Sequence, residues 1–257
     1  MVTFASMIKL VRSELVYSDM GERDEWCINP YDLIMLNSLM DLKQRCECKV
    51  IGVTMGPESC MESLQKLFAM GLDDIYLVCD NEFAGSDTYA TSYILSEMIS
   101  KKINADVIVC GEKSVDGETG QIGSQLAKRV DVHCCTGVEE IVRFDEDSII
   151  VKNRNMEFCE TLKADLPVVL NYHGLETKQP QYSLPKLKRA KKRQIQIVNA
   201  EELGLDKSLC GQKGSKTKVV RICEEKRANV VFPVEGELKE KADFLYQLLQ
   251  KEKKMNV

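Results

Sequence analysis

Short apolar runs that alternate with helix-forming segments constrain the fold of this chain more than any other feature. The expected elements, in chain order, are a strand over Phe4–Val11, a helix after Ile28, a strand over Cys48–Met55, a helix from Gly56 to Met70 that stops at Gly71, a strand over Asp74–Cys79, a helix over Asp87–Lys102, a strand over Asp106–Cys110 and a helix from near Glu118. Strands that are apolar on both faces belong inside a parallel sheet, and the intervening helices cover its two sides. The sequence therefore predicts an α/β fold with a doubly wound, mostly parallel sheet.

After Val138 the alternation of apolar runs with helix-forming segments gives way to β-rich runs. Two β-rich runs, Ile149–Asn153 and Val168–Tyr172, are separated by polar turns and predict a β-hairpin region and a final strand. The stretch beyond Leu205 is more polar, and we interpret Gly211–Ser215 as a linker. The chain is expected to end in an amphipathic helix that needs its own body or a partner to pack on, with these apolar residues on one side: Ala242, Leu245, Leu248 and Leu249.

Composition and charge exclude several classes of protein. The net charge of −5 over 257 residues argues against a protein that coats nucleic acid or an anionic membrane. No run of about 18 apolar residues is present, so we expect no membrane insertion. The N-terminus lacks the basic and apolar regions of a secretory signal, which favours a cytoplasmic protein.

Eleven cysteines are scattered along the chain, most of them in apolar runs. We interpret them as buried free thiols in a reducing compartment. The closest pairs are Cys46 with Cys48 and Cys134 with Cys135, and neither pair has the two-residue gap of a zinc or iron–sulfur ligand set. Only two histidines are available to complete such a set, so we expect no metal site.

The segment from Cys110 to Gln121 is the strongest candidate for a ligand site. It leaves the end of a buried strand, contains three glycines and leads into a helix. Small residues let a ligand approach the backbone, and free amides at a helix start attract anions. An Asp-Gly turn before a helix cap explains the same residues, because the segment has neither a Walker loop nor a Gly-x-Gly-x-x-Gly fingerprint. Spacing alone leaves both interpretations open.

The place of this segment in the predicted sheet favours a ligand site. Ligands of open α/β sheets bind beyond the carboxyl ends of the strands, where the strand order reverses. If the strands Phe4–Val11 and Asp106–Cys110 flank that point, the loops that follow them face the same crevice.

Gly111–Gly123 closely resembles the nucleotide-binding loop of electron-transfer flavoprotein beta subunits. Further blocks match that family in the expected order: Asn29–Asp32, Thr54–Pro57, Ala69–Asp74, Phe83–Thr88, Leu166–Val169 and Tyr182–Pro185. The resemblance covers residues 28–198, and the occurrence of these six further blocks in the order of the family makes it specific.

The resemblance implies an adenine-nucleotide alpha-hydrolase-like fold and an electron carrier that has no independent catalytic residues. Such a beta subunit works beside a larger, flavin-carrying alpha subunit and serves a flavin dehydrogenase of the acyl-CoA type, with NADH as a candidate electron donor. It implies a nucleotide-binding domain over residues 1–200 and, over 201–257, an arm and helix that pack on the alpha subunit. The implied nucleotide contacts are Met7, Asn29, Pro30, Tyr31, Asp32, Met55, Gly111, Glu112, Lys113, Ser114, Val115, Asp116, Gly117, Glu118, Thr119 and Gln121.

The nucleotide implied by the resemblance is FAD or AMP. The compact loop Asp116–Thr119 resembles that of electron-bifurcating members, which hold FAD in the beta subunit. Housekeeping members have a longer loop, hold AMP there and keep FAD in the alpha subunit. The first strand end, Ile8–Glu14, departs from the family because it lacks a proline, and the segment to Trp26 is too short for a full β-hairpin. We expect FAD, with AMP as the alternative.

The polar segment Gly174–Leu187 is expected to be an exposed loop. Its Leu184, between Tyr182 and Pro185, is by resemblance the anchor that inserts into the partner dehydrogenase. A hydrophobic contact at a helix start is the alternative explanation. Six basic residues in Lys186–Arg193 are expected to form a solvated face or a docking surface for an acidic partner.

Two other functions fit the same fold, namely a nucleotide-hydrolysing or adenylating enzyme and a nucleotide sensor. The enzyme needs a positioned base or metal-binding carboxylates, and the loop supplies only Asp116 and Glu118, with no histidine nearby. A sensor would bind adenine nucleotide without the absorbance of a flavin.

Overall fold

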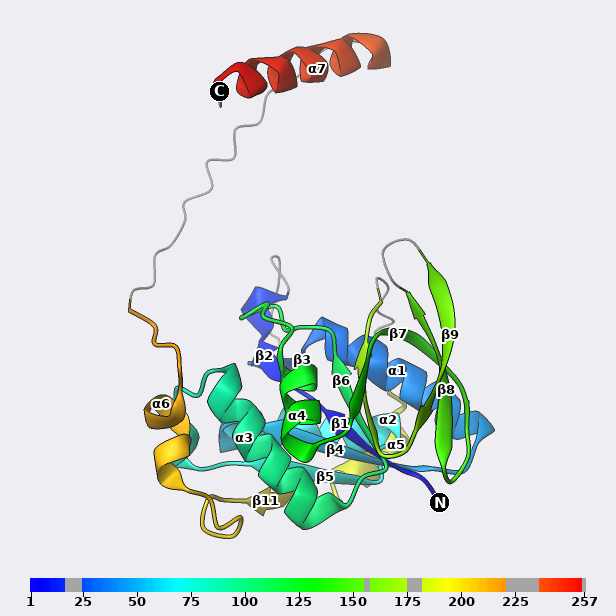
Figure 1. Ribbon diagram of the computed structural model, residues 1–257, viewed down its shortest axis with the longest axis vertical. Helices are drawn as coiled ribbons and strands as arrows, with labels where there is room; N and C mark the ends of the chain where they lie inside the picture. Colours follow the sequence, from blue (N-terminus) through cyan, green and yellow to red (C-terminus); the bar gives the residue numbers. More distant parts are fainter. Residues whose placement is uncertain (17–24, 155–157, 175–181, 221–235, 256–257) are drawn as a thin grey trace. The chain divides into compact units, whose positions relative to one another are not determined.

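The computed structural model describes residues 1–16, 25–154, 158–174, 182–220 and 236–255 (Figure 1). Contacts divide the chain into two compact units, Met1–Lys218 and Val219–Val257. The first unit is an α/β fold built on a mostly parallel sheet, which confirms the predicted fold class.

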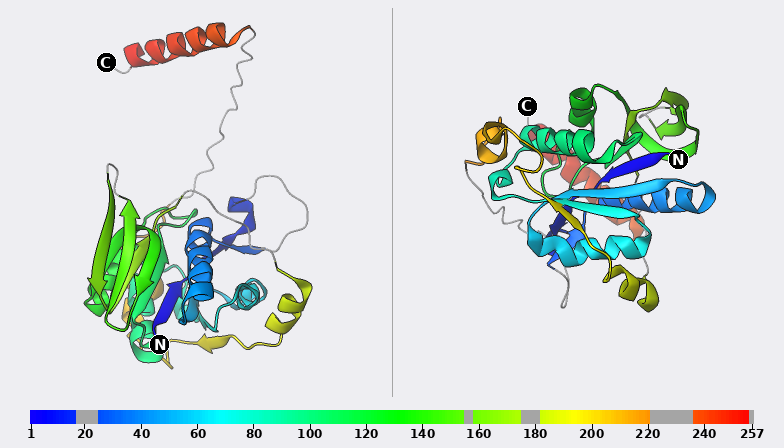
Figure 2. Two further views of the ribbon diagram at one scale, coloured as in Figure 1. Left: turned by 90° about the vertical axis from the view of Figure 1, so that its right-hand side faces the viewer. Right: turned by 90° about the horizontal axis from the view of Figure 1, so that it is seen from below.

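The large sheet has the strand order β11-β5-β4-β1-β6-β10-β7-β8-β9. Its first seven strands run parallel, and β7, β8 and β9 form an antiparallel meander at one end (Figure 2). A second, two-stranded sheet pairs β2 with β3. The strands are β1 Thr3–Met7, β2 Leu10–Arg12, β3 Trp26–Ile28, β4 Lys49–Met55, β5 Asp74–Val78, β6 Val107–Gly111, β7 His133–Phe144, β8 Ser148–Arg154, β9 Cys159–Asp165, β10 Val168–Tyr172 and β11 Gln196–Val198.

Helices cover both faces of this sheet. The helices of the first unit are α1 Pro30–Arg45, α2 Met61–Met70, α3 Thr88–Met98, α4 Ile122–Val130, α5 Leu184–Ala190 and α6 Gly211–Gly214. Phe4 and Leu170 pack with α1 and α2 in one buried cluster. Their chain neighbours Ala5 and Val169 pack with α3 and α4 in a second cluster on the other face. The alternation of successive side chains along each strand therefore builds two cores, one on each side of the sheet.

The helix ends follow local chemistry. Pro30 opens α1, where its missing amide costs nothing, and Lys43 and Arg45 lie in the last turn, where they complement the negative end of the dipole. Gly71 follows α2 with φ of +130°, so the predicted stop at this glycine is confirmed. Asp131 ends α4 in the left-handed conformation.

The predicted single strand Phe4–Val11 is wrong, because the chain leaves the sheet after Met7. The Lys9 amide donates to the carboxylate of Asp32 at 2.7 Å, and the Lys9 carbonyl accepts from the Asn29 amide at 2.9 Å. The next residues form β2, whose three residues pair with β3 in antiparallel register. The segment to Trp26 is predicted to be too short for a full β-hairpin, and the pairing of β2 with β3 extends over only three residues of each strand.

Other predicted boundaries also shift. The fourth helix starts at Ile122 rather than near Glu118, because Glu118 and Gly120 have positive φ values. Asp87–Lys102 divides into α3 and a π-helical turn, Ile99–Ile103. The predicted hairpin region is a three-stranded meander, and Val168–Tyr172 is not a terminal strand but lies between β6 and β7.

Gly211–Ser215, predicted as a linker, is part of the first unit. Gly211 has φ of +57° and fits against the carbonyls of Glu82 and Ala84, where any Cβ atom would overlap them. The Ser215 hydroxyl donates to the carbonyl of Gly211 at 2.7 Å. Backbone contacts over a long sequence distance fix this segment, and composition does not reveal them.

The second unit contains the predicted amphipathic helix. It is α7, Leu238–Met255. Among the side chains of α7 that the structure describes, the large apolar residues Leu238, Phe244, Leu245 and Tyr246 are exposed. An apolar surface of this kind on a single helix needs a partner surface to bury it.

Replacing Phe4 by alanine is expected to destabilise the first unit by about 3–5 kcal/mol, because truncating a buried aromatic residue leaves a cavity. The Phe4 ring is fully buried and packs edge-on against Phe144 with 5.4 Å between centroids. Phe158→Ala is the matched control, since that ring is 64% exposed and its loss is expected to cost less than about 0.5 kcal/mol. Urea denaturation of both variants measures the difference, and equal costs would contradict this account of the core.

Candidate functional site

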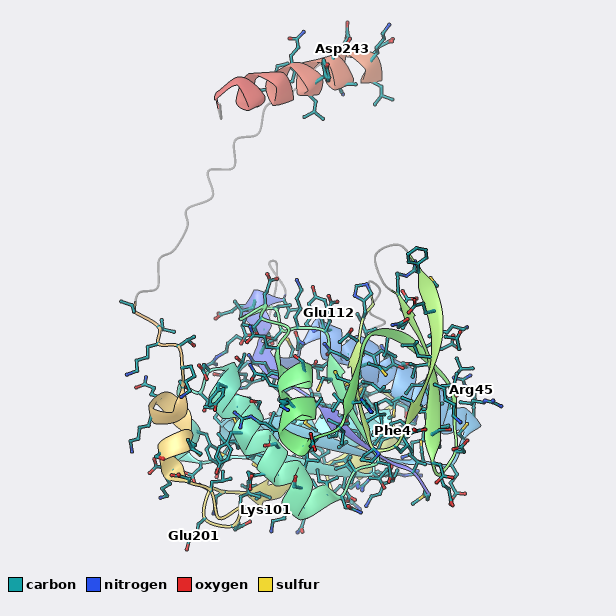
Figure 3. The ribbon with its side chains drawn as sticks, in the orientation of Figure 1. Phe4, Arg45, Lys101, Glu112, Glu201 and Asp243 are labelled. Carbon is teal, nitrogen blue, oxygen red and sulfur yellow. The ribbon has the colours of Figure 1, made fainter. Side chains whose placement is uncertain are left out.

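The strand order reverses between β1 and β6. From β1 the chain builds outwards through β4 and β5, and it then crosses to the other side of β1 to form β6. The predicted switch point between these two strands is thus confirmed. Their carboxyl ends, at Met7 and Gly111, lie at the edge of the sheet where ligands of such folds bind. Figure 3 labels Glu112, the residue that directly follows β6, at this edge.

A buried carboxylate joins the two strand ends. Asp32, in the first turn of α1, accepts the amide of Lys9 at 2.7 Å and also the amide of Gly111. A Cβ atom on Gly111 would overlap the Asp32 carboxylate, so this position requires glycine. Burial raises the pKa of Asp32 to about 7, while the amides and the Lys9 charge partly oppose that rise.

Asn29 holds the loop that follows β6. Its side-chain amide donates to the carbonyl of Lys113 at 2.8 Å, and its side-chain oxygen accepts the amide of Val115 at 3.2 Å. Only 1% of the Asn29 side chain is exposed. A second brace comes from Lys9, whose ammonium group lies 2.7 Å from the Asp116 carboxylate. The loop therefore has a fixed shape before any ligand arrives.

The end of this loop is shaped to present backbone amides. Glu118 and Gly120 have φ values of +51° and +62°, and Gln121 returns to the right-handed region at φ −99° and ψ −17°. Alternation of this kind forms the concave amide nests that bind anions. No side chain caps α4 at Gln121, so the first amides of that helix add to the same positive field.

The cations beside the loop are already engaged. Lys9 pairs with Asp116, and Lys113 lies 3.6 Å from the carboxylate of Glu118 and 5.5 Å from the ring centre of Tyr31. With these positive charges balanced by carboxylates, the backbone amides are the groups best placed to hold a phosphate. The acidic loop suits one or two phosphates better than a triphosphate.

A polar cavity of about 370 Å³ opens beside the loop, at the carboxyl ends of β6 and β10 and next to Thr136 and Gly137 of β7. One wall holds a hydrogen bond of 2.8 Å between His173 Nδ1 and a carboxylate oxygen of Glu112. The side-chain oxygen of Asn171 is buried and has no hydrogen-bond partner among the described residues. The cavity is therefore suited to a ligand that donates hydrogen bonds. Its lining consists of Glu112, Lys113, Glu118, Thr119, Gly120, Thr136, Gly137, Asn171 and His173.

Apart from Gly111 and Gln121, the structure separates the predicted contact residues into three groups. The cavity brings together Glu112, Lys113, Glu118 and Thr119. The rest of the loop (Ser114, Val115, Asp116 and Gly117), together with Asn29, Asp32 and the residues Pro30 and Tyr31 that open α1, forms the frame behind it. Met7 is 6% exposed and belongs to a core cluster, against which Met55 packs, so neither methionine lines the cavity. Gln121 accepts a hydrogen bond from Thr88.

Sequence reasoning missed six residues of this region: Lys9, Gly120, Thr136, Gly137, Asn171 and His173. A signal for the last two was present, since Asn171 and His173 are polar residues at the end of an apolar strand. The parallel pairing of β10 with β6, which carries them to the loop, is not readable from that strand alone.

The predicted docking residues lie at the start of α5. Leu184 is the first residue of that helix and is 81% exposed, Pro185 is exposed, and Tyr182 packs against the core. The predicted loop over Gly174–Leu187 is wrong from Leu184 onwards, because α5 begins at that residue. Residues 175–181 lie outside the described ranges.

The basic run beyond Leu184 serves two purposes. The guanidinium of Arg193 donates to the carbonyl of Leu72 at 3.1 Å and lies 4.2 Å from the ring centre of Phe68, so this residue holds α5 and its neighbours to the body. The remaining basic residues of the run project from the surface: Lys186, Lys188, Arg189, Lys191 and Lys192.

Comparison with known proteins identifies the family. The model of the electron transfer flavoprotein domain matches residues 19–203. The chain belongs to the family of electron transfer flavoprotein beta subunits. It is 34% identical to the electron transfer flavoprotein subunit beta of Thermoanaerobacterium thermosaccharolyticum, over 86% of this chain and 85% of that protein.

Two further relatives carry other names. Subunit CarD of the caffeyl-CoA reductase-Etf complex from Acetobacterium woodii is 35% identical over 76% of this chain and 74% of its own length. Protein FixA of Sinorhizobium fredii is 36% identical over 76% of this chain and 71% of its own length. The resemblance read from the sequence motifs is confirmed by these matches.

Several other features bear on the chemistry of this beta subunit. Among the described residues, no group of three or more His, Cys, Asp or Glu side chains is placed to hold a metal ion. The ten cysteines in the described ranges are free thiols, and Cys159 is exposed. None of the helices in the part of the chain that the structure describes has the length and apolar character needed to cross a membrane.

Asp32→Asn is expected to change how stability depends on pH. The unfolded carboxyl loses its proton near pH 3.8, whereas the folded one keeps it until about pH 7. Between these values the native state binds more protons, so Asp32 makes the wild type lose stability as the pH rises. The free energy of unfolding of the wild type should fall relative to Asp32→Asn by on the order of 2–4 kcal/mol from pH 4 to pH 7. Urea denaturation across this range measures the difference, and a constant difference would show that Asp32 is ionised throughout.

Proposed function

We propose that this beta subunit binds the phosphate of an adenine nucleotide at the turn Glu118–Gln121 and works in electron transfer beside a larger, flavin-carrying alpha subunit. The observation that carries the proposal is the rigid loop at the switch point, which Asn29, Asp32 and Lys9 hold in place before ligand binding. Preorganised amides bind an anion without the cost of ordering the loop. The family membership supports the electron-transfer role.

The cavity beside the turn favours a dinucleotide over a mononucleotide. Its polar lining includes the unpartnered oxygen of Asn171 and the His173–Glu112 pair, which suit the hydroxyl groups of a second sugar or a ribityl chain. We therefore propose FAD in this subunit, which with the compact loop agrees with electron bifurcation. AMP here, with FAD only in the alpha subunit, is the alternative. The flavin, when bound in the complex, supplies the electron-carrying chemistry.

The electrons are proposed to pass from a donor such as NADH to a flavin dehydrogenase of the acyl-CoA type in the cytoplasm. A relative named as a subunit of a caffeyl-CoA reductase complex supports a partner that acts on a CoA thioester. The exposed apolar side chains of α7 support packing of residues 201–257 on the alpha subunit. This subunit is proposed to have no catalysis of its own.

Docking to the dehydrogenase is assigned to the start of α5. Leu184 is the most exposed of the described leucines within the first unit, and the exposed lysines and Arg189 follow it in the same helix and the turn beyond. An apolar anchor beside a basic surface fits a partner that presents an apolar pocket with an acidic rim. Electrostatic attraction raises the association rate, and the leucine sets the lifetime of the contact.

Nucleotide content is the decisive measurement for the ligand. The chain, co-expressed with its alpha subunit, is denatured and the released nucleotides are separated and quantified. We expect two FAD per heterodimer. One FAD with one AMP would overturn FAD in this subunit and leave the phosphate site intact, whereas no nucleotide beyond the alpha-subunit FAD would overturn both. Adenine nucleotide bound by the chain without any flavin in the complex would instead favour a sensor.

Gly120→Ala tests the turn itself. The glycine has φ of +62°, and an added Cβ atom would lie 3.3 Å from the carbonyl oxygen of Glu112, so the turn must open. We expect nucleotide content to fall roughly tenfold or more. Gly204→Ala is the matched control, because Gly204 has a similar φ of +56° with open space around it and lies outside the site. Equal nucleotide content in the two variants would refute the phosphate site at this turn.

Leu184→Ala tests the docking contact. Loss of a leucine buried at an interface is expected to raise the KM for the partner dehydrogenase roughly tenfold or more, with nucleotide content unchanged. Ile197→Ala is the matched control, since Ile197 is a partly exposed apolar residue on the edge strand β11. Unchanged electron transfer in Leu184→Ala would remove the docking role of this residue.

A further inference from the structure

Asp87, the residue before α3, binds two segments of the chain with its two carboxylate oxygens. One oxygen caps α3 by accepting the amides of Tyr89 and Ala90 at 2.9 and 3.0 Å. The other accepts the amides of Lys216 and Thr217 at 2.7 and 2.8 Å and the Thr217 hydroxyl at 3.0 Å. Burial raises the pKa of Asp87, but these donors outweigh it and hold that pKa below the ordinary value.

The residues held by Asp87 are the last of the first unit. The first unit ends at Lys218, and the segment that carries α7 follows. Two more bonds fix the same place, since the Asp87 amide donates to the Ser215 hydroxyl at 2.9 Å and that hydroxyl donates to the Gly211 carbonyl at 2.7 Å. The Lys216 ammonium also lies 5.1 Å from the ring centre of Tyr89. Residues 215–217, which we call the arm root, are thus tied to the start of α3.

The start of α3 also contacts the proposed phosphate turn. The Thr88 hydroxyl donates to the side-chain oxygen of Gln121 at 3.0 Å, and Gln121 directly follows Gly120. Gln125 reinforces this contact, because its side-chain amide donates to the same Gln121 oxygen at 3.2 Å. The chain of contacts from the phosphate turn to the arm root therefore passes through one dipeptide, Asp87-Thr88.

We propose that Asp87 and Thr88 are positioning residues that couple occupancy of the phosphate turn to the anchoring of the C-terminal arm. The inference rests on the proposed function of that turn. An anion held by the first amides of α4 restrains Gln121, which strengthens its bond to Thr88 and orders the start of α3. The ordered α3 start places the Asp87 carboxylate against the arm root. Because binding equilibria are linked, a partner that holds the arm also tightens nucleotide binding.

The two halves of the contact are separable by substitution. Asp87→Asn has one acceptor oxygen in place of two, so it cannot satisfy both the α3 amides and the arm-root amides. Thr88→Val keeps the shape of the side chain and leaves Asp87 intact, but it removes the bond to Gln121. Asp206→Asn is the matched control, because Asp206 caps a short helical turn through Ser208 and holds neither the arm root nor Gln121.

Amide hydrogen exchange at Lys216 and Thr217 in the full chain reports the coupling directly. Addition of AMP, the probe, is expected to slow exchange at these two amides at least about fivefold in the wild type and in Asp206→Asn. Asp87→Asn should exchange faster without AMP and lose the effect of AMP. Thr88→Val should keep the slow exchange of the free wild type and lose only the effect of AMP.

Each outcome decides a different part of the proposal. Calorimetry that shows AMP binding, with exchange at Lys216 and Thr217 unchanged, overturns the coupling and leaves the proposed function standing. If AMP does not bind, FAD replaces it as the probe in the same exchange measurement. Absence of binding of both AMP and FAD by calorimetry overturns the proposed nucleotide site and the coupling with it. Exchange in Asp87→Asn equal to that of the wild type overturns the anchor.

A second variant keeps the test decisive if Asp87→Asn does not fold. Lys216→Pro removes one donor to the Asp87 carboxylate and the contact of the Lys216 ammonium with Tyr89, but it leaves the cap of α3 by Asp87 intact. Ser215 has ψ of 137°, the extended conformation required before proline. Faster exchange at Thr217 in this variant supports the anchor, and unchanged exchange overturns it.

Discussion

A single buried carboxylate holds the functional edge of this protein together. Asp32 accepts amides from the ends of β1 and β6, the two strands between which the sheet changes direction. Two parallel strands pair along their length, but nothing in that pairing fixes the loops beyond them. Asp32 fixes them, because it lies on a third element, α1, and accepts the amides of Lys9, two residues beyond β1, and of Gly111, the last residue of β6. The turn of the chain at Lys9, the path of the loop after Gly111 and the position of Asn29 all follow from it.

The division of the sheet into two apolar faces sets where chemistry occurs. Helices α1 and α2 cover one face and α3 and α4 the other, so ligands have access only at the strand ends. Elements from both faces meet there. Asn29 and Asp32 reach the loop from α1, while Gln121 and Thr88 approach it from the α4 and α3 side. A nucleotide bound at this edge, as proposed, would therefore contact both layers.

Periodicity predicted the parts of the fold that depend on local burial. The buried strands Lys49–Met55, Asp74–Val78 and Val107–Gly111 and the stop of α2 at Gly71 agree with the expected positions. The errors arise where a distant group takes a backbone amide. Asp32 ends the first strand early, and Ser86 and Ala84 hold the presumed linker by accepting the amides of Gly211 and Gln212. The late start of α4 has a local cause, the positive φ values at Glu118 and Gly120. The motif blocks identified the loop but not the cavity beside it, because His173 and Asn171 reach that place only through the pairing of β10 with β6.

The central position of β10 also has a consequence for how the chain matures on the ribosome. β10 lies between β6 and β7, yet it follows β7, β8 and β9 in the sequence. The growing chain can complete the meander while the adjoining edge of β6 still lacks its neighbour. Only when Val168–Tyr172 emerges can the two blocks join into one sheet, and until then unpaired backbone and apolar side chains are open to solvent. The interval between the synthesis of β6 and that of β10 is therefore the stage at which the centre of the sheet has an unpaired edge.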